Sequence, residues 1–363
     1  MTSGLPADPD GYTLTVDGED VGAIGCHESR AIDGLVGSTH EVVLSDVAAN
    51  CEVVDGNERV VSNQGSKGWV QFQIICSGAG SLEDQIVFTS VPRAFGEAIW
   101  VMDSDGSNAA LLSPPRQRSD FAAVSPDGLK LAFASTGEDF MGRWALYVMN
   151  ADGSEVSRLT GYSDDVPGSW SPDGSRIAFT SGRHGGGGGK AMQAPGASGG
   201  NTEIYIIDAN GSAEIRLTDD PGQDLSPAWS PDGSSIAFAT DREGNFEIYM
   251  MWLNDGRLQN LTANPALDAQ PVWSPDGSKI AFTSGRDGNE EIYVMNRTGT
   301  ELRRLTDHPA ADEQPAWSAD GREVLFSSDR GGTFQIYKVS VDGGAPIQLT
   351  DSRFESLRGV ASP

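Results

Sequence analysis

The sequence predicts an all-β protein in which a small N-terminal β-sandwich domain precedes a six-bladed β-propeller. The main observation is a repeated phrase. Ser-Pro-Asp-Gly begins at Ser125, Ser171, Ser230 and Ser274, and a Ser-Ala-Asp-Gly version begins at Ser318. The intervals are 46, 59, 44 and 44 residues. A period of about 40–45 residues with strand-like segments is typical of propeller blades, each of which is a four-stranded sheet.

Residues 270–306 contain each element that one blade requires. The apolar residues of the second segment are adjacent rather than alternating, which is typical of a strand buried on both faces where blades stack. Gly277 closes a hairpin turn and supplies the positive φ that such turns need. In chain order we expect an inner strand at 271–274, a turn at 275–277, a second strand at 280–283, a third strand at 291–295 and an outer strand at 302–306.

Six copies of the second strand set the number of blades. Each copy has two apolar residues followed by phenylalanine, at Phe88, Phe133, Phe179, Phe238, Phe282 and Phe326. The first repeat lacks its inner strand, but a step of 44 residues from Ser318 reaches Ser362. We therefore expect residues 360–363 to complete the first blade, because closing the ring removes exposed sheet edges.

The repeat resembles that of TolB-type propellers. The resemblance rests on Trp-Ser-Pro-Asp-Gly-Ser-Lys-Ile-Ala-Phe from Trp273 and on Arg-Asp-Gly-Asn-Glu-Glu-Ile-Tyr-Val-Met-Asn from Arg286. It covers residues 81–363, which we assign to the propeller domain. The resemblance implies an exported binding protein more often than an enzyme.

Residues 1–80 are expected to form the sandwich domain, because segments such as 12–18 and 69–74 alternate between apolar and polar residues. They do not look like the α/β domain of TolB, and they resemble the small sandwich repeats of PEGA type. All three cysteines lie in this part of the chain. We expect a disulfide between Cys51 and Cys76, with Cys26 free, since such a pair is typical of small domains in oxidising compartments.

Composition and charge limit the location and the partners. The formal net charge is −27, which disfavours nucleic acid and anionic membrane surfaces and favours basic partners. No apolar run approaches the 18 or so residues of a membrane helix. The start of the chain lacks the pattern of a signal peptide, so the sequence is either cytosolic or a mature form. The cysteines favour the mature form of a periplasmic, cell-surface or secreted protein.

Four aspartates and four arginines recur at fixed places in the repeat, in loops that should emerge on the same side of the propeller. They are candidates for a charged rim around the mouth of the central channel, which would bind a ligand or protein. The alternative is a structural ion pair repeated with the blade, and the two readings are compatible. The residues are Asp165, Asp224, Asp268, Asp312, Arg183, Arg242, Arg286 and Arg330.

Other motifs favour structural roles. Asp103-Ser104-Asp105-Gly106 resembles a calcium loop but lacks the downstream glutamate, so a tight turn explains it better. A calcium site near Asp164-Asp165 or Asp219-Asp220 remains open. The residues 182–201 are rich in glycine and are expected to form a flexible insertion. The tryptophans at the ends of the inner strands are expected to pack between blades rather than to stack on sugars.

We therefore expect a non-catalytic, exported binding or scaffold protein that engages a protein or peptide, which is basic by the charge argument, at one face of the propeller. Only His184 and His308 lie in the propeller, and no histidine pair has metal-ligand spacing. The alternatives are a carbohydrate-active lyase or hydrolase that uses the channel mouth, and a structural subunit of a cell surface or filament. No cofactor is expected. Fold alone does not decide among them.

Overall fold

The computed structural model divides the chain into two compact units, Met1–Gly80 and Ser81–Pro363. Within the described ranges no helix is long and apolar enough to cross a membrane. The structure describes residues 12–17, 19–24, 31–33, 39–45, 51–54, 58–62, 67–69, 73–76, 82, 85–91, 97–113, 117–137, 142–161, 163–183, 201–351 and 355–361.

The N-terminal unit is built from short strands. One sheet has the order β2-β1-β4-β6, and two further pairs are β3-β7 and β5-β8. In the last pair the backbone register places Cys51 directly opposite Cys76. The disulfide and the sandwich packing stay predictions, and Cys26 lies outside the described residues. The strands are β1 (Tyr12–Val16), β2 (Glu19–Ile24), β3 (Ala31–Asp33), β4 (Thr39–Ser45), β5 (Cys51–Val54), β6 (Glu58–Ser62), β7 (Lys67–Trp69) and β8 (Gln73–Cys76).

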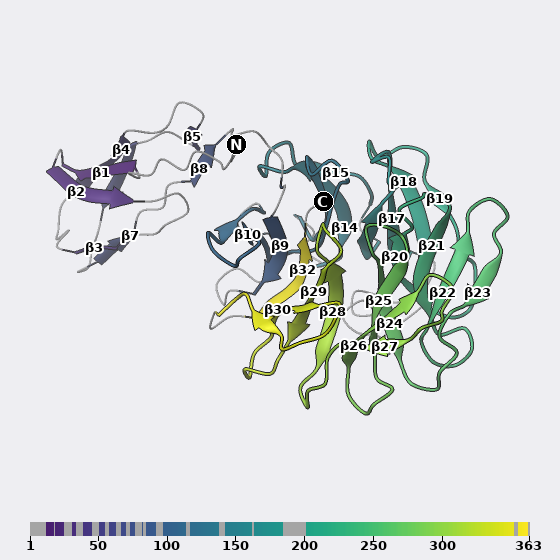
Figure 1. Cartoon of the computed structure of the whole chain (residues 1–363). Helices are drawn as coiled ribbons and strands as arrows, with labels where there is room; N and C mark the ends of the chain where they lie inside the picture. The colour runs from purple at the N-terminus through teal and green to yellow at the C-terminus, as the bar shows by residue number, and fades with distance from the viewer. Residues whose placement is uncertain are drawn as a thin grey trace. The chain divides into compact units, whose positions relative to one another are not determined.

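The second unit consists of six four-stranded antiparallel sheets, which confirms the predicted propeller (Figure 1). The inner strands are β32 (Ser356–Ala361), β12 (Ser119–Val124), β16 (Asp165–Trp170), β20 (Asp224–Trp229), β24 (Asp268–Trp273) and β28 (Asp312–Trp317), in blades 1 to 6. The second strands are β9 (Gln85–Ser90), β13 (Lys130–Ser135), β17 (Arg176–Ser181), β21 (Ser235–Thr240), β25 (Lys279–Ser284) and β29 (Glu323–Ser328).

The remaining two strands of each blade lie progressively farther from the centre. The third strands are β10 (Ala98–Asp103), β14 (Ala145–Asn150), β18 (Glu203–Asp208), β22 (Glu247–Trp252), β26 (Glu291–Asn296) and β30 (Gln335–Ser340). The outer strands are β11 (Ala110–Leu111), β15 (Ser157–Arg158), β19 (Ile215–Arg216), β23 (Leu258–Asn260), β27 (Arg303–Arg304) and β31 (Ile347–Gln348). These edge strands are only two or three residues long, which limits edge-to-edge pairing with other chains.

The core lies between the blades. The middle strands are buried on both faces, as their unbroken apolar sequences predict, and the six phenylalanines of the second strands are at most 4% exposed. The tryptophans at the ends of the inner strands also pack between blades, as expected. The Trp273 indole nitrogen donates to the Ala228 carbonyl of the preceding blade (3.1 Å), and Trp317 donates to Val272 (3.1 Å).

The C-terminal strand closes the ring. β32 pairs with β9, so that Val360 faces Val87 and Ala361 faces Ile86. In Figure 1 the yellow end of the chain lies beside the dark blue first blade. The repeat spacing therefore predicted the closing strand correctly, although Ser362 and Pro363 lie outside the described residues. Closure also lets Phe88 of blade 1 pack against Leu325 of blade 6.

Candidate binding site on the loop face

The propeller has two distinct faces, because each inner strand begins on one side and ends on the other. On the side that we call the loop face, outer strands lead into the next inner strands and second strands turn into third strands. On the opposite side, the turn face, the Ser-Pro-Asp-Gly turns follow the inner strands. The predicted aspartates and arginines belong to the loop face.

The structure brings each predicted aspartate together with one predicted arginine, within a single blade. Each aspartate begins an inner strand, and its arginine follows the second strand of the same sheet. The shortest distances from the arginine Nη2 to the carboxylate are 3.0 Å for Asp165–Arg183, 3.1 Å for Asp224–Arg242, 2.8 Å for Asp268–Arg286 and 2.8 Å for Asp312–Arg330.

Each arginine is held by more than its carboxylate. In blade 5 the Nε of Arg286 donates to the Ser284 hydroxyl (2.7 Å). Its guanidinium carbon lies 4.8 Å from the centroid of the Tyr293 ring and 5.6 Å from that of Phe282. The other three blades repeat this stack with Phe179 and Tyr205, Phe238 and Tyr249, and Phe326 and Tyr337.

Burial determines what these pairs can contact. The four aspartates are fully buried, and burial raises their pKa values, opposed by hydrogen bonds and by the arginine charges. The arginine side chains are 13–20% exposed. A partner at the loop face would therefore reach the arginine edges and not the carboxylates. The pairing explains why the eight residues repeat, and their role in ligand binding stays a prediction.

A second set of residues surrounds the axis of the propeller. The third residue of five inner strands adopts a left-handed backbone with φ near +55° at a bulge, where the register with the second strand shifts. These residues are Phe121, Ser226, Gln270, Gln314 and Arg358. Blade 3 has Pro167 at this place, which cannot adopt positive φ. Sequence reasoning missed this set, because the bulge leaves no residue type in common.

Hydrogen bonds link these residues from blade to blade. The Gln314 backbone N–H donates to the Gln270 side chain (2.9 Å), and the Ser327 hydroxyl donates to the Gln314 side chain (3.1 Å). The Arg358 backbone N–H then donates to the Ser327 hydroxyl (3.0 Å). The Arg358 guanidinium pairs with Asp120 of blade 2 (2.8 Å) and lies 4.0 Å above the Phe121 ring centroid. The closing strand is thereby fixed to both neighbouring blades.

Buried glutamates at the start of three third strands form another network that the sequence analysis missed. Glu291 accepts hydrogen bonds from the Thr306 hydroxyl (2.6 Å), the His308 backbone N–H (2.8 Å) and the Arg304 guanidinium (2.7 Å). Burial by itself would raise the pKa of Glu291, but these hydrogen bonds lower it below the ordinary value. The signal in the sequence is an asparagine two residues before each glutamate, as in Asn289, whose side-chain amide donates to Glu291 (3.1 Å).

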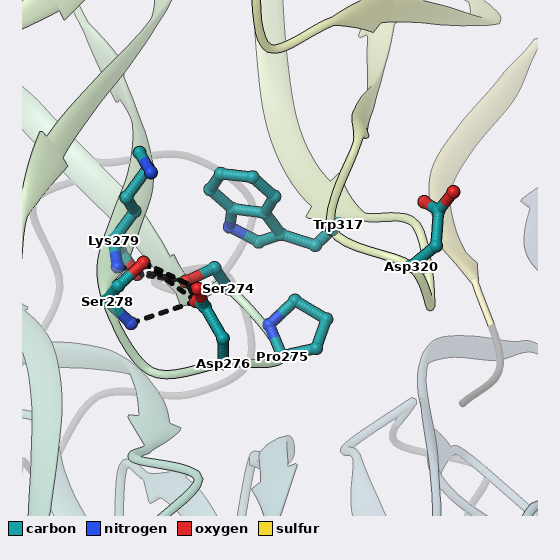
Figure 2. Close-up of a pocket in the computed structure, with 8 residues that line it drawn as sticks. Ser274, Pro275, Asp276, Ser278, Lys279, Trp317 and Asp320 are labelled. Atoms are coloured by element: carbon teal, nitrogen blue, oxygen red, sulfur yellow. Dashed lines mark hydrogen bonds between the residues drawn. The ribbon is translucent and has the colours of Figure 1, made fainter.

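The turn face carries a small pocket of about 140 Å³ between blades 5 and 6 (Figure 2). The Ser-Pro-Asp-Gly turn of blade 5 forms one wall, and Trp317, Asp320 and Gly321 form the other. Figure 2 shows that Asp276 is tied to its own turn by hydrogen bonds. Its Oδ1 accepts from the Ser274 hydroxyl (2.6 Å) and from the Ser278 backbone N–H (3.0 Å). The pocket lining is therefore a structural turn.

The remaining predicted features have different outcomes. Among the described residues, no group of three or more His, Cys, Asp or Glu side chains is arranged to hold a metal ion. The segment that resembles a calcium loop, Asp103-Ser104-Asp105-Gly106, is a tight turn in the structure, and Gly106 adopts φ of +91°. Residues 184–200 of the expected insertion lie outside the described residues, as does His184.

Comparisons with known proteins identify the propeller. Residues 187–271 and 263–363 match the model of the TolB beta propeller domain (PD40). A Tol-Pal system protein TolB of Anaeromyxobacter dehalogenans is 30% identical over 225 residues, in a match that covers 58% of this chain and 45% of that protein. A TolB homolog of Chlorobium chlorochromatii is 33% identical over 159 residues, 44% of this chain and 31% of that protein.

A solved structure supports the fold. TolB from Acinetobacter baumannii superposes with a TM-score of 0.66 at 20% identity, covering 92% of this chain and 81% of that chain. The chain spans less than half the length of the two curated relatives it matches. At this identity the solved structure shows the fold alone. The second unit of the chain is therefore a six-bladed propeller, of which residues 187–363 are similar to the TolB beta propeller domain.

Proposed function

We propose that this protein binds a protein or peptide partner through the loop face of its propeller, in the bacterial envelope or outside the cell, without catalysis of its own. The observation that supports this most is the match to the TolB beta propeller domain, together with relatives that are named as Tol-Pal system proteins. The blades form a rigid scaffold, and binding residues are often found on the loops that such a scaffold positions.

The charge of the loop face supports a basic partner. The chain has a formal net charge of −27, and the acidic side chains of Asp219, Glu243, Glu290 and Asp307 are exposed on this face. A negative surface accelerates the association of a positive partner, and this effect weakens as salt rises. Glu313, near the start of β28, is a further acidic side chain and is partially buried. Burial raises its pKa, the charge of Arg358 lowers it, and the charge of Glu290 raises it.

The bonding of the loop-face groups supports a binding role rather than catalysis. The four aspartates and their arginines are engaged with one another and with aromatic rings. The ring nitrogen Nδ1 of His308 accepts a hydrogen bond from the Ala310 backbone N–H (3.1 Å). General acid–base catalysis instead needs a group that is free to exchange a proton with a substrate.

The test uses the full chain and an envelope extract from the source organism, with captured proteins identified by cross-linking and mass spectrometry. Two variants make the same change on opposite faces of blade 5. Glu290→Lys alters an exposed residue on the loop face, and Glu301→Lys alters an exposed residue on the turn face. We expect Glu290→Lys to weaken binding of the captured protein and to flatten its salt dependence, while Glu301→Lys leaves both unchanged.

A partner that cross-links to the turn face, or that binds both variants equally, would contradict the proposed surface. Turnover of a substrate by the purified protein would contradict the absence of catalysis. Hydrogen exchange of the two variants serves as the control, because it shows directly whether each blade remains folded.

A further inference from the structure

Two blades contain what we call the arginine seat, which consists of a buried glutamate carboxylate and a threonine carbonyl. In blade 3, Arg216 donates from Nη2 to Glu203 (2.6 Å) and from Nε to the Thr218 carbonyl (2.7 Å). In blade 5, Arg304 makes the same two bonds to Glu291 (2.7 Å) and to the Thr306 carbonyl (2.6 Å). The guanidinium thus neutralises a carboxylate that would otherwise be buried without a cation.

Blade 4 has the same seat without its arginine. Glu247 and Thr262 stand in the equivalent places on β22 and after β23 (Figure 1), but Asn260 occupies the arginine position. The Asn260 side chain turns back on its own loop, where Oδ1 accepts from the backbone N–H groups of Thr262 and Ala263 (3.0 Å each). Within the described part of the chain, no cation pairs with Glu247 and no side chain donates to the Thr262 carbonyl.

Exposure distinguishes this seat from the two occupied ones mainly at the threonine. Glu203 and Glu291 are fully buried, and Glu247 is also buried at 4% exposure. The threonines of the occupied seats are also buried, while Thr262 is only half-buried. Glu247 keeps hydrogen bonds from the Thr262 hydroxyl, the Asn245 amide (3.0 Å) and the Asn264 backbone N–H (2.7 Å). Because a carboxylate offers about four acceptor positions, these three bonds leave room for another donor.

A second carboxylate borders the open seat. In blade 5, Nη1 of Arg304 also pairs with Asp287 (3.3 Å), which lies in the turn after the second strand. Glu243 holds the same place in blade 4 and is exposed, with a hydrogen bond from the Tyr249 hydroxyl and a long contact with Asn260 (3.4 Å). In blade 6 both positions are uncharged. Gln335 replaces the glutamate, and Gln348 replaces the arginine and donates to the Thr350 carbonyl (2.7 Å). Blade 4 alone keeps the acid of blades 3 and 5 while lacking their cation.

We propose that the seat formed by Glu247, Thr262 and Glu243 binds an arginine side chain of a partner protein. A guanidinium is planar and presents donors on two edges, so one group can bond the Glu247 carboxylate, the Thr262 carbonyl and Glu243 together. A lysine ammonium is a point charge and matches this arrangement less well. That the arginine belongs to a partner protein rests on the proposed function, whereas the binding of a guanidinium group at this seat does not.

The experiment separates these two points with a small probe. N-acetyl-arginine amide is titrated into the isotope-labelled full chain, and the amide resonances of Asn245, Thr262 and Asn264 are followed by NMR. We expect saturable shifts at these positions and binding at least about tenfold weaker for N-acetyl-lysine amide, which corresponds to roughly 1.4 kcal/mol.

Two variants provide the matched test. Asn260→Arg supplies the missing arginine from the chain itself, so it should raise the melting temperature and abolish the shifts caused by the probe. Gln348→Arg places the same residue at the equivalent position of blade 6, where Gln335 replaces the buried glutamate. That variant should gain no stability and should bind the probe as the wild type does.

The proposal is overturned if the probe shifts nothing at the seat, or if its shifts persist in Asn260→Arg. It is also overturned if Asn260→Arg gains no more stability than Gln348→Arg. If the probe binds the seat while a captured partner occupies the turn face, the proposed binding surface fails and the seat stands.

Discussion

The arginine of each stack contacts four neighbouring side chains at once. Arg286 holds the buried Asp268 carboxylate, donates to Ser284, and lies against the Phe282 and Tyr293 rings. Its planar charge suits both the carboxylate and the aromatic faces, which lysine would not. The stack therefore fixes the end of the second strand to the start of the inner strand in each of four blades.

Removing the arginine should leave the aspartate charge buried without a cation. We expect Arg286→Gln to lower the free energy of unfolding by about 3 kcal/mol, since breaking a buried ion pair from one side is costly. The double variant Asp268→Asn/Arg286→Gln should recover part of this loss. Urea denaturation of the wild type, both single variants and the double variant measures the coupling. Additive losses would mean that the two side chains stabilise the blade independently.

The same variant should respond to pH in a defined direction. Burial raises the pKa of Asp268 in the folded protein, so protonation favours the folded state over the unfolded state. The penalty of Arg286→Gln should consequently be largest at neutral pH and should shrink as the pH falls through the titration of this carboxyl. Chemical denaturation at a series of pH values tests this. A penalty that grows with acidification would contradict the assigned direction.

At this scale the sequence predicted the positions of the pairs but not their burial. The constant spacing of 18 residues between Asp268 and Arg286 was visible, and so was its repetition. The glutamate networks could not be predicted from the sequence, because strand pairing, and not local spacing, brings Glu291 to Thr306 and Arg304. The open seat at Glu247 became visible only when equivalent blades could be compared residue by residue.

The Ser-Pro-Asp-Gly turn is the element that repeats most faithfully, and its aspartate explains why. The Asp276 carboxylate accepts hydrogen bonds from Ser274 and Ser278, and these lower its pKa to about 2. Gly277 adopts φ of +67°, which other residues adopt only at a cost. The turn could therefore be predicted well from the sequence, since its hydrogen bonds join residues that are close together in the chain.

We expect Asp276→Ala to destabilise the propeller by about 1 kcal/mol at neutral pH, because exposed hydrogen bonds contribute modestly. The folded pKa is lower than the unfolded one, so the stabilisation is present above pH 4 or so and is lost as the pH falls toward 2. The stabilities of wild type and variant should thus converge in acid, as measured by thermal melting across this range. A difference that is constant with pH would show that the ionised carboxylate is not responsible.

In the N-terminal unit, the β5–β8 pair carries a prediction about the cysteines. The register that places Cys51 opposite Cys76 agrees with the bond expected from the sequence, which would stabilise the unit by about 3 kcal/mol by constraining the unfolded chain. Peptide mapping under non-reducing conditions should find Cys51 joined to Cys76 and Cys26 free. A bridge that includes Cys26 would overturn the assignment.

For the whole molecule, the ring depends on its last strand. Deleting residues from Ser356 onward removes the inner strand of blade 1, the Arg358–Asp120 pair and the part that Ala361 plays in the packing of blade 1 against blade 6. We expect a loss of several kcal/mol or complete failure to fold, as the loss of a core strand implies. The milder variant Arg358→Ala keeps the strand and should melt below the wild type. Truncated protein that melts at the wild-type temperature would show that β32 is dispensable.

The order of synthesis gives this closure a further meaning. Arg358 and Asp120, which meet at the seam, are 238 residues apart in the chain. A ribosome releases the early blades first, and domains tend to fold as they emerge. Blade 1 nevertheless stays one strand short until Ala361 has been made, and its second strand must wait with an open edge during that time. Contacts of such long range also slow folding. During each round of translation, the exposed edge of β9 must therefore be kept from pairing with the strands of another chain.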